Sequence, residues 1–192
     1  MNDLAERVKR AVLDSADAKQ CFANRAAGEI ARAVELVAGC LRTGHKVLLC
    51  GNGGSAADAQ HIAGELVGRF RRERPAFAAI ALTTDTSILT AIANDYGFEA
   101  VFARQVEGLG AEGDVLLAYS TSGNSPNVLK AIEAARGRGM RVIGLTGASS
   151  GAMAGRCDVL IQAPAEDTPT VQECHATAGH TICRLVEEIL CP

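Results

Sequence analysis

From Lys46 onward, the chain alternates short apolar runs with segments of helical pattern. The apolar runs predict strands at 46–50, 77–82, 114–119, 141–145 and 158–162. Helices are predicted at about 55–70, 86–94, 99–109, 125–138 and 169–190, with a short turn near 151–155. Apolar strands separated by helices form a parallel sheet that is covered on both faces. We therefore predict an α/β fold, a three-layer doubly wound sandwich around a five-stranded parallel sheet.

The residues before the first strand carry helical patterns instead. One apolar stripe at four-residue spacing runs through about residues 3–20, and a second runs from Ile30 to Leu41, just before Gly44. Long amphipathic helices must bury such stripes against their own domain or against another subunit. We predict that residues 1–43 are a helical extension used in oligomerisation.

Length and composition exclude several classes of protein. The 192 residues suit one domain, and we expect residues 1–192 to form a single domain. A net charge of −3 argues against electrostatic binding of nucleic acid. No apolar run approaches the roughly 20 residues that cross a bilayer, and the first residues lack the pattern of a signal peptide. Seven Cys without a CxxC pair disfavour a disulfide framework, so we expect a cytoplasmic protein with reduced thiols.

Two loops rich in Gly, Ser and Asn follow the first and third predicted strands. They are residues 51–55 (GNGGS) and 120–125 (STSGNS), and each leads into a predicted helix. Such loops bring backbone N–H groups, hydroxyls and a helix N-terminus together, which suits a phosphate or another anion. The hydroxyls of the second loop belong to Ser120, Thr121, Ser122 and Ser125. Because a helix cap needs only one hydroxyl, we interpret the second loop as a phosphate anchor. The first loop lacks both the G-x-G-x-x-G spacing and the Walker Lys, which disfavours dinucleotide and nucleoside triphosphate binding.

Ionisable residues gather in two predicted helices. His61 and Glu65 are four residues apart and therefore leave the same face of the helix that follows the first loop. They suit a general base with its partner or two ligands of a divalent metal, and a solvated polar pair is the plainer alternative. On the last helix, Glu173 lies about 20° and Gln172 about 80° from His180 around the helix axis. Each of these residues is a candidate for contact with a substrate.

Asn94 and Asp95 form a third candidate group at the end of the helix that begins near Thr86. Asn and Asp at this position favour a helix exit. Their polar groups can also bind sugar hydroxyls.

Four segments, CGNGGSAADAQHIAGEL, LTAIANDYGFE, GDVLLAYSTSGNSPNV and VQECHATAGH, together resemble the phosphoheptose isomerases (sedoheptulose 7-phosphate isomerases). This family belongs to the sugar isomerase, or SIS, fold group, which is flavodoxin-like, and the similarity runs from about residue 26 to the C-terminus. The resemblance implies an aldose–ketose isomerase that converts sedoheptulose 7-phosphate to D-glycero-D-manno-heptose 7-phosphate. That reaction is the first step toward the nucleotide-activated heptoses of bacterial surface polysaccharide, such as the lipopolysaccharide core.

The resemblance also implies roles for individual residues. The positions that contact phosphate in the family match Ser55, Ser120, Thr121, Ser122 and Ser125. The positions that contact the sugar match Asn52, Gly53, Gly54, Asn94, Asp95 and Gln172, and Glu65 also touches the substrate. One zinc ion per subunit is expected on His61, Glu65, Gln172 and His180. Glu65 and His180 are expected to transfer protons as well. Family members are typically homotetramers with active sites between subunits, which would give the N-terminal stripes a place to be buried.

Three alternatives remain open at this stage. Because a zinc-bound Glu or His is a poorer base, either one ligand leaves the metal or the metal is chiefly an organiser. A non-catalytic SIS protein that binds sugar phosphates or regulates replication shares both loops, but Glu65 favours an enzyme. An isomerase of another phosphosugar also shares the loops, and the set of four predicted zinc ligands favours the heptose. An NAD-dependent oxidoreductase is disfavoured.

Overall fold

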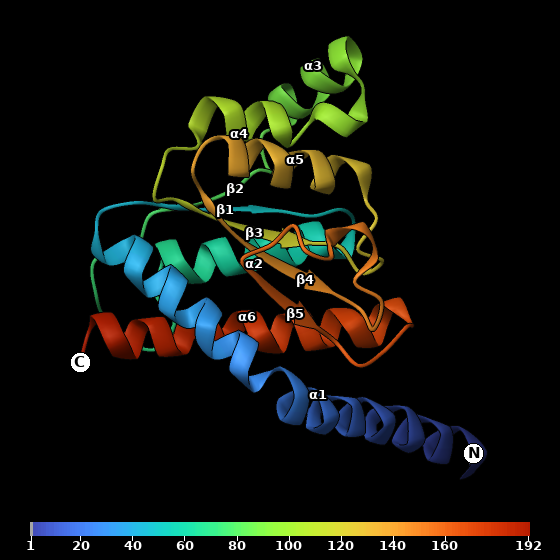
Figure 1. The fold of residues 1–192 in the computed structure, drawn as a ribbon. Coiled ribbons are helices and arrows are strands. Elements are labelled where there is room, and N and C mark those ends of the chain that lie inside the picture. Colours follow the sequence, from blue (N-terminus) through green and yellow to red (C-terminus); the bar gives the residue numbers. More distant parts are fainter. Residues whose placement is uncertain (1) are drawn as a thin grey trace.

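The structure, a computed structural model, describes residues 2–192 and contains one parallel sheet between two layers of helices (Figure 1). The strands are β1 (Val47–Cys50), β2 (Ala79–Ala81), β3 (Val115–Tyr119), β4 (Arg141–Thr146) and β5 (Val159–Gln162). Their order in the sheet is β2-β1-β3-β4-β5, and every neighbouring pair is parallel. This confirms the predicted doubly wound α/β fold.

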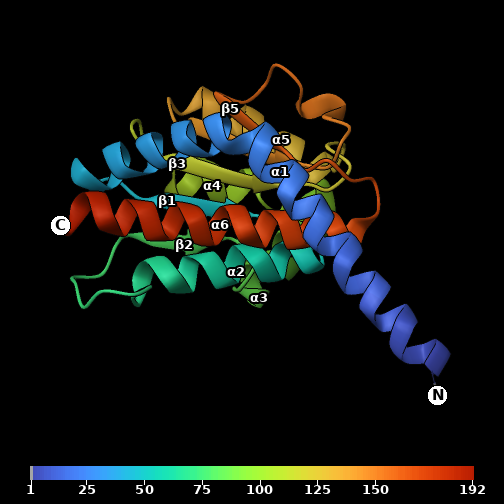
Figure 2. The same cartoon turned by 90° about the horizontal axis from the view of Figure 1, so that it is seen from below.

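The helices form a layer on each face of the sheet (Figure 1). They are α1 (Asn2–Arg42), α2 (Gly54–Val67), α3 (Thr86–Tyr96), α4 (Ala103–Leu109), α5 (Pro126–Gly137) and α6 (Thr168–Leu190), with short 3-10 helices at Phe98–Ala100 and Gly151–Met153. Helices α1, α6 and α2 lie side by side on one face (Figure 2). Helices α4 and α5 cover the other face, and α3 lies on the outer side of that layer.

Alternate residues of the central strands pack against the two helical layers, as strand geometry requires. Val47 and Leu49 of β1 belong to the core shared with α1, α2 and α6. Leu48 and Cys50 belong to the core shared with α4 and α5. All four side chains are fully buried, because the strand is covered on both faces.

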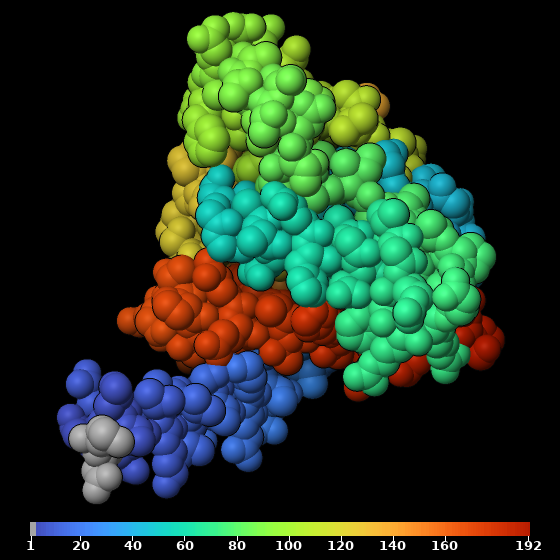
Figure 3. Space-filling view, turned by 180° about the vertical axis from the view of Figure 1, so that it is seen from behind, coloured from blue at the N-terminus to red at the C-terminus, as the bar shows by residue number. Residues whose placement is uncertain are grey.

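The N-terminal region is one continuous helix rather than the two helical segments that the two stripes predict. Residues 2–42 contain no proline, and nothing in that sequence forces a break. The second part of α1 packs against α6, whereas the first part projects away from the body (Figures 2 and 3). Leu4 and Val12 on the projecting part are 66% and 64% exposed. None of the described helices, α1 included, is both long and apolar enough to cross a membrane.

Two further helix boundaries differ from the prediction. Helix α2 ends at Val67 instead of residue 70. Gly68 leaves the helical conformation, and the backbone N–H groups of residues 70–72 donate to the carboxylate of Glu187 on α6. The predicted helix at 99–109 is divided into the 3-10 helix Phe98–Ala100 and α4. The first difference is important for the site described below.

Candidate active site

The two Gly/Ser loops leave the sheet next to each other. Strands β1 and β3 are hydrogen-bonded neighbours with Cys50 opposite Ala118, and the loops 51–55 and 120–125 follow them directly. Chain order reverses at this point of the sheet, since β2 lies on one side of β1 and β3 on the other. In doubly wound folds this switch point opens the crevice that receives a ligand.

The second loop is folded around the hydroxyl of Ser120. This side chain is 3% exposed, and its Oγ lies 2.9 Å from Oγ of Ser125. Gly123 has a φ of +67°, and a Cβ there would overlap the carbonyl of Ser150, so only glycine fits. Ser125 precedes α5 without a side-chain cap bond among the described residues. In the first turn, Val128 N–H donates to Asn127 Oδ1 and Leu129 N–H to the Ser125 carbonyl, so the anion would meet the Asn127 N–H and the positive end of the helix dipole.

The first loop positions the start of α2. Gly53 has a φ of +55° at the N-cap, and a Cβ on Gly54 would overlap the side-chain amide of Gln172 on α6. Asn52 exchanges two hydrogen bonds of 2.8 Å with Asn127 at the start of α5, so the two loops are tied together. The glycines therefore allow α6 and the second loop to approach this turn closely.

Three ionisable side chains converge between α2 and α6. Nε2 of His180 lies 2.9 Å from Nε2 of His61, and the same His61 nitrogen lies 3.2 Å from Oε1 of Glu65. One ligand atom from each residue lies within 4.8 Å of the others. Two imidazoles and a carboxylate are a donor set that catalytic zinc uses while keeping a fourth position open. The residues present therefore fit a zinc ion.

Known proteins share this architecture along most of the chain. The SIS domain family matches residues 14–147. The phosphoheptose isomerase of Nitratidesulfovibrio vulgaris is 50% identical over 191 residues, which cover 97% of this chain and 92% of that protein. The phosphoheptose isomerase of Bradyrhizobium sp. (strain ORS 278) is 62% identical over 159 residues, which cover 83% and 80%. The solved structure of the phosphoheptose isomerase of Neisseria gonorrhoeae matches with a TM-score of 0.91 and 47% identity, covering 96% of this chain and 99% of that one. This chain belongs to the phosphoheptose isomerases.

Not all of the predicted site residues of this isomerase meet in one place. Gln172 lies eight residues before His180, about 12 Å along α6, and its amide lies against Gly54. The exposed Asn94 and Asp95 bond to each other at 2.8 Å on α3, in the layer on the other face of the sheet from α2 and α6. Among the described residues, the cluster of His61, Glu65 and His180 thus contains three of the four predicted zinc ligands.

Glu173 has a structural partner instead of a place in this cluster. Its carboxylate accepts hydrogen bonds from Ser15 and, at 2.7 Å, from Lys19 Nζ, both on α1. The expectation that Glu173 meets a substrate considered α6 alone, whereas α1 passes over this turn of the helix. The hydrogen bonds from Lys19 and Ser15 hold the pKa of Glu173 below its ordinary value.

Two residues that are not among the predicted site residues, Phe70 and Asp58, lie beside the cluster of His61, Glu65 and His180. The Phe70 ring stacks on the His180 imidazole, with centroids 5.7 Å apart and planes 29° apart. Asp58 lines a small cavity of about 50 Å³ with His61 and His180. Burial raises the pKa of Asp58, and the two imidazoles oppose that rise. Asp58 precedes His61 by three residues, a helical spacing that places the two side chains on neighbouring positions of one face.

Proposed function

We propose that this isomerase interconverts sedoheptulose 7-phosphate and D-glycero-D-manno-heptose 7-phosphate, as the first step toward nucleotide-activated heptoses. Its membership of the phosphoheptose isomerases supports a phosphorylated seven-carbon sugar as substrate. The observation that carries the chemistry is the convergence of Glu65 and His180 from two different helices, at the distances given above. A carboxylate and an imidazole at one point are sufficient for the proton transfers of an aldose–ketose isomerisation.

The reaction moves one proton between neighbouring carbons. A base removes a proton from C1 of the ketose to form an enediol. The base exchanges its proton with solvent and a proton is then delivered to C2, while a second proton moves from O1 to O2. We assign these two transfers to Glu65 and His180. His61 lies within hydrogen-bond distance of both side chains, so it orients them toward each other.

The phosphate of the substrate is proposed to bind the hydroxyls of Ser55, Ser120, Thr121, Ser122 and Ser125. Replacing both Ser120 and Ser122 with Ala is expected to raise KM at least tenfold, since each hydrogen bond to a charged group contributes about 1.5–3 kcal/mol. Steady-state kinetics with sedoheptulose 7-phosphate measure this change. Thr43→Ala is the matched control, because it removes an exposed hydroxyl before the amino end of β1, whereas the loops follow the carboxyl ends of the strands. An unchanged KM in the double variant would place the phosphate elsewhere.

The proposed metal is one zinc ion per subunit, held by His61, Glu65 and His180. Gln172, the fourth ligand that the resemblance implies, lies about 12 Å along α6 from His180 in the same chain, so it does not reach this ion from its position against Gly54. When bound, the ion would polarise the carbonyl of the substrate. We expect elemental analysis of the purified protein to find up to one zinc per subunit, and His61→Gln to lose most of it. His45→Gln should retain the metal, since His45 lies beside Asp114 before β1 and away from the cluster. Full activity in the presence of a chelator, in a protein without zinc, would contradict the metal role.

The quaternary structure is proposed to be a homotetramer with active sites between subunits. Two observations support a partner: the apolar stripe on the projecting part of α1 is exposed, and α3 has no buried residue. A neighbouring subunit would cover both surfaces. It would also give Asn94 and Asp95 access to a site that their own sheet separates them from.

We propose further that residues 1–192 are a single SIS domain in which residues 1–43 serve the assembly, and that the enzyme is cytoplasmic. The SIS match begins at residue 14, inside α1, which supports a domain that includes the helix.

The proposed sugar-binding group consists of Asn52, Gly53, Gly54, Asn94, Asp95 and Gln172. Of these, Gln172 and Gly54 are in contact.

A further inference from the structure

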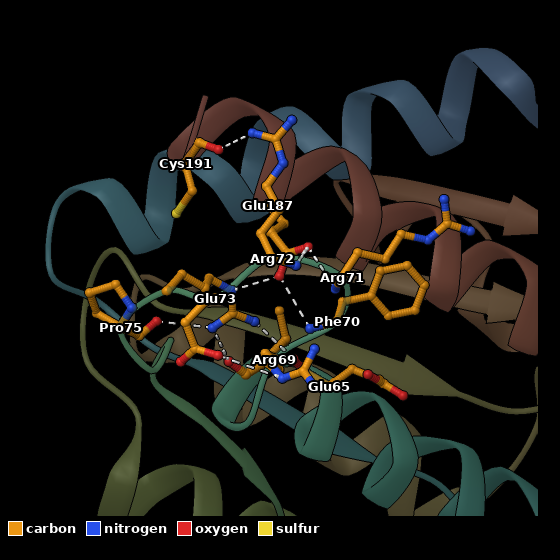
Figure 4. Close-up of polar contacts among 11 residues, drawn as sticks. Glu65, Arg69, Phe70, Arg71, Arg72, Glu73, Pro75, Glu187 and Cys191 are labelled. Atoms are coloured by element: carbon orange, nitrogen blue, oxygen red, sulfur yellow. Dashed lines mark hydrogen bonds and ion pairs between the residues drawn. The ribbon is translucent and has the colours of Figure 1, made fainter.

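The segment that follows α2 is attached to α6 by one buried carboxylate. Glu187 accepts hydrogen bonds from the backbone N–H groups of Phe70, Arg71 and Arg72 at 3.1, 2.8 and 2.9 Å (Figure 4). It also accepts one from Nε of Arg74 at 3.0 Å. Three successive N–H groups aimed at one carboxylate define the path of this segment and end α2 at Val67.

Arg74 attaches the same segment to the end of α2. Its guanidinium donates to the carbonyls of Glu65 at 2.9 Å and Leu66 at 3.0 Å, two acceptors of the last helical turn that have no partner within the helix. The guanidinium also lies 3.9 Å from the ring centroid of Phe77. The side chains of Arg74 and Glu187 are each 2% exposed. This buried ion pair therefore connects α2, α6 and the segment between Gly68 and Phe77.

The result of this attachment is that Phe70 lies on His180. The Phe70 and His180 ring planes are inclined by 29°, whereas the His61 ring meets His180 edge-on, with centroids 4.9 Å apart and planes 65° apart. The terminal torsion of a histidine is broad, so the imidazole turns easily unless its neighbours restrict it. Phe70 and His61 both restrict the imidazole of His180, and Phe70 is itself anchored through its backbone N–H to Glu187.

We propose that Phe70 is a positioning residue that keeps the His180 imidazole directed at His61 and Glu65, and that Glu187 and Arg74 hold Phe70 in place. This inference rests on the proposed catalytic role of His180. Its physical basis is that a small misplacement of a catalytic group costs up to about 10²-fold in rate. A ring that fixes orientation without touching the substrate changes kcat and leaves KM almost unaffected.

The test compares Phe70→Leu with Phe70→Tyr in the full-length enzyme. Phe70→Leu is expected to lower kcat about 10- to 100-fold with KM within about twofold, and Phe70→Tyr is expected to retain the wild-type kcat because it keeps the ring. Proton–carbon NMR of histidine-labelled protein gives an independent signal. Loss of the stacked ring should move the His180 ring resonance in Phe70→Leu and not in Phe70→Tyr. Unchanged kcat and an unmoved resonance in Phe70→Leu would overturn the proposal, as would equal losses in both variants.

His180→Gln separates this inference from the proposed function. This variant removes one ring signal and so assigns the resonance. If it also retains turnover, the catalytic role of His180 is wrong, while the resonance comparison still decides whether Phe70 positions the ring.

Glu187→Gln and Arg74→Lys extend the test to the anchor. In either variant the His180 resonance is expected to move in the same direction as in Phe70→Leu. Arg74→Lys keeps the positive charge beside Glu187, so it provides the measurement if Glu187→Gln does not fold. A wild-type resonance in the folded variants would show that Phe70 does not depend on the ion pair.

Discussion

Glu65→Gln is expected to lower kcat by about 10²–10⁴-fold and to leave a folded oligomer of unchanged size. The amide has nearly the same shape as the carboxylate but cannot take up a proton at neutral pH. Glu65 contributes its backbone carbonyl to the Arg74 contact, and the substitution preserves that group. Turnover of sedoheptulose 7-phosphate, together with circular dichroism and size-exclusion chromatography, measures both parts of the expectation.

Glu188→Gln is the control for this experiment. Glu188 lies on the surface of α6 beside Arg184, so the substitution also removes one carboxylate while leaving the cluster intact. We expect its kcat to equal that of the wild type. Near-normal turnover of Glu65→Gln would remove Glu65 from the proton transfers.

Glu187→Ala is expected to lower the free energy of unfolding by about 3–5 kcal/mol. Removing one partner of a buried ion pair leaves the other charge without compensation, which costs about that much. The substitution also leaves three backbone N–H groups without their acceptor. Urea unfolding at a fixed protein concentration measures the change, with Glu188→Gln as the exposed counterpart. A loss below about 1 kcal/mol, in the range of surface ion pairs, would contradict the structural role of Glu187.

The same carboxylate predicts how stability depends on pH. Burial alone would raise the pKa of Glu187, but the N–H groups of residues 70–72 and Arg74 outweigh it and hold the pKa below the ordinary value of 4.5. A lowered pKa contributes stability that is present above 4.5 and is lost as the pH falls through the folded-state pKa. In Glu187→Gln, the decrease in the free energy of unfolding that protonation of Glu187 causes at acid pH should be absent. The control Glu188→Gln should retain it.

The sheet could be predicted from sequence because its signals are local. Each strand begins and ends within two residues of its prediction, since apolar runs buried on both faces stand out from the polar segments between them. The positions of the two loops follow from the same alternation. Parallel order then places both loops at one edge of the sheet.

The end of α2 could not be predicted in this way. Helical pattern continues through residue 70, and the chain leaves the helix because of a carboxylate 117 residues further on. The Phe70–His180 stack depends on that long-range contact and was missed for the same reason. Local patterns do not report partners that are distant in sequence.

The cluster could be predicted only in part. The four-residue spacing of His61 and Glu65 places them on one face, but the meeting of His61 with His180 depends on how α2 packs on α6. On the last helix considered alone, Gln172 and Glu173 are both candidates for contact with a substrate. In the fold, Gly54 meets the first and α1 meets the second.

Exchange of the transferred proton tests the central claim most directly. We expect the enzyme, incubated with sedoheptulose 7-phosphate in deuterated water and followed by NMR, to form the aldose with deuterium at the carbon next to the carbonyl. Glu65→Gln should form neither product nor label at a comparable rate. Absence of the aldose, or an aldose without deuterium, would contradict an enediol mechanism at Glu65 and His180.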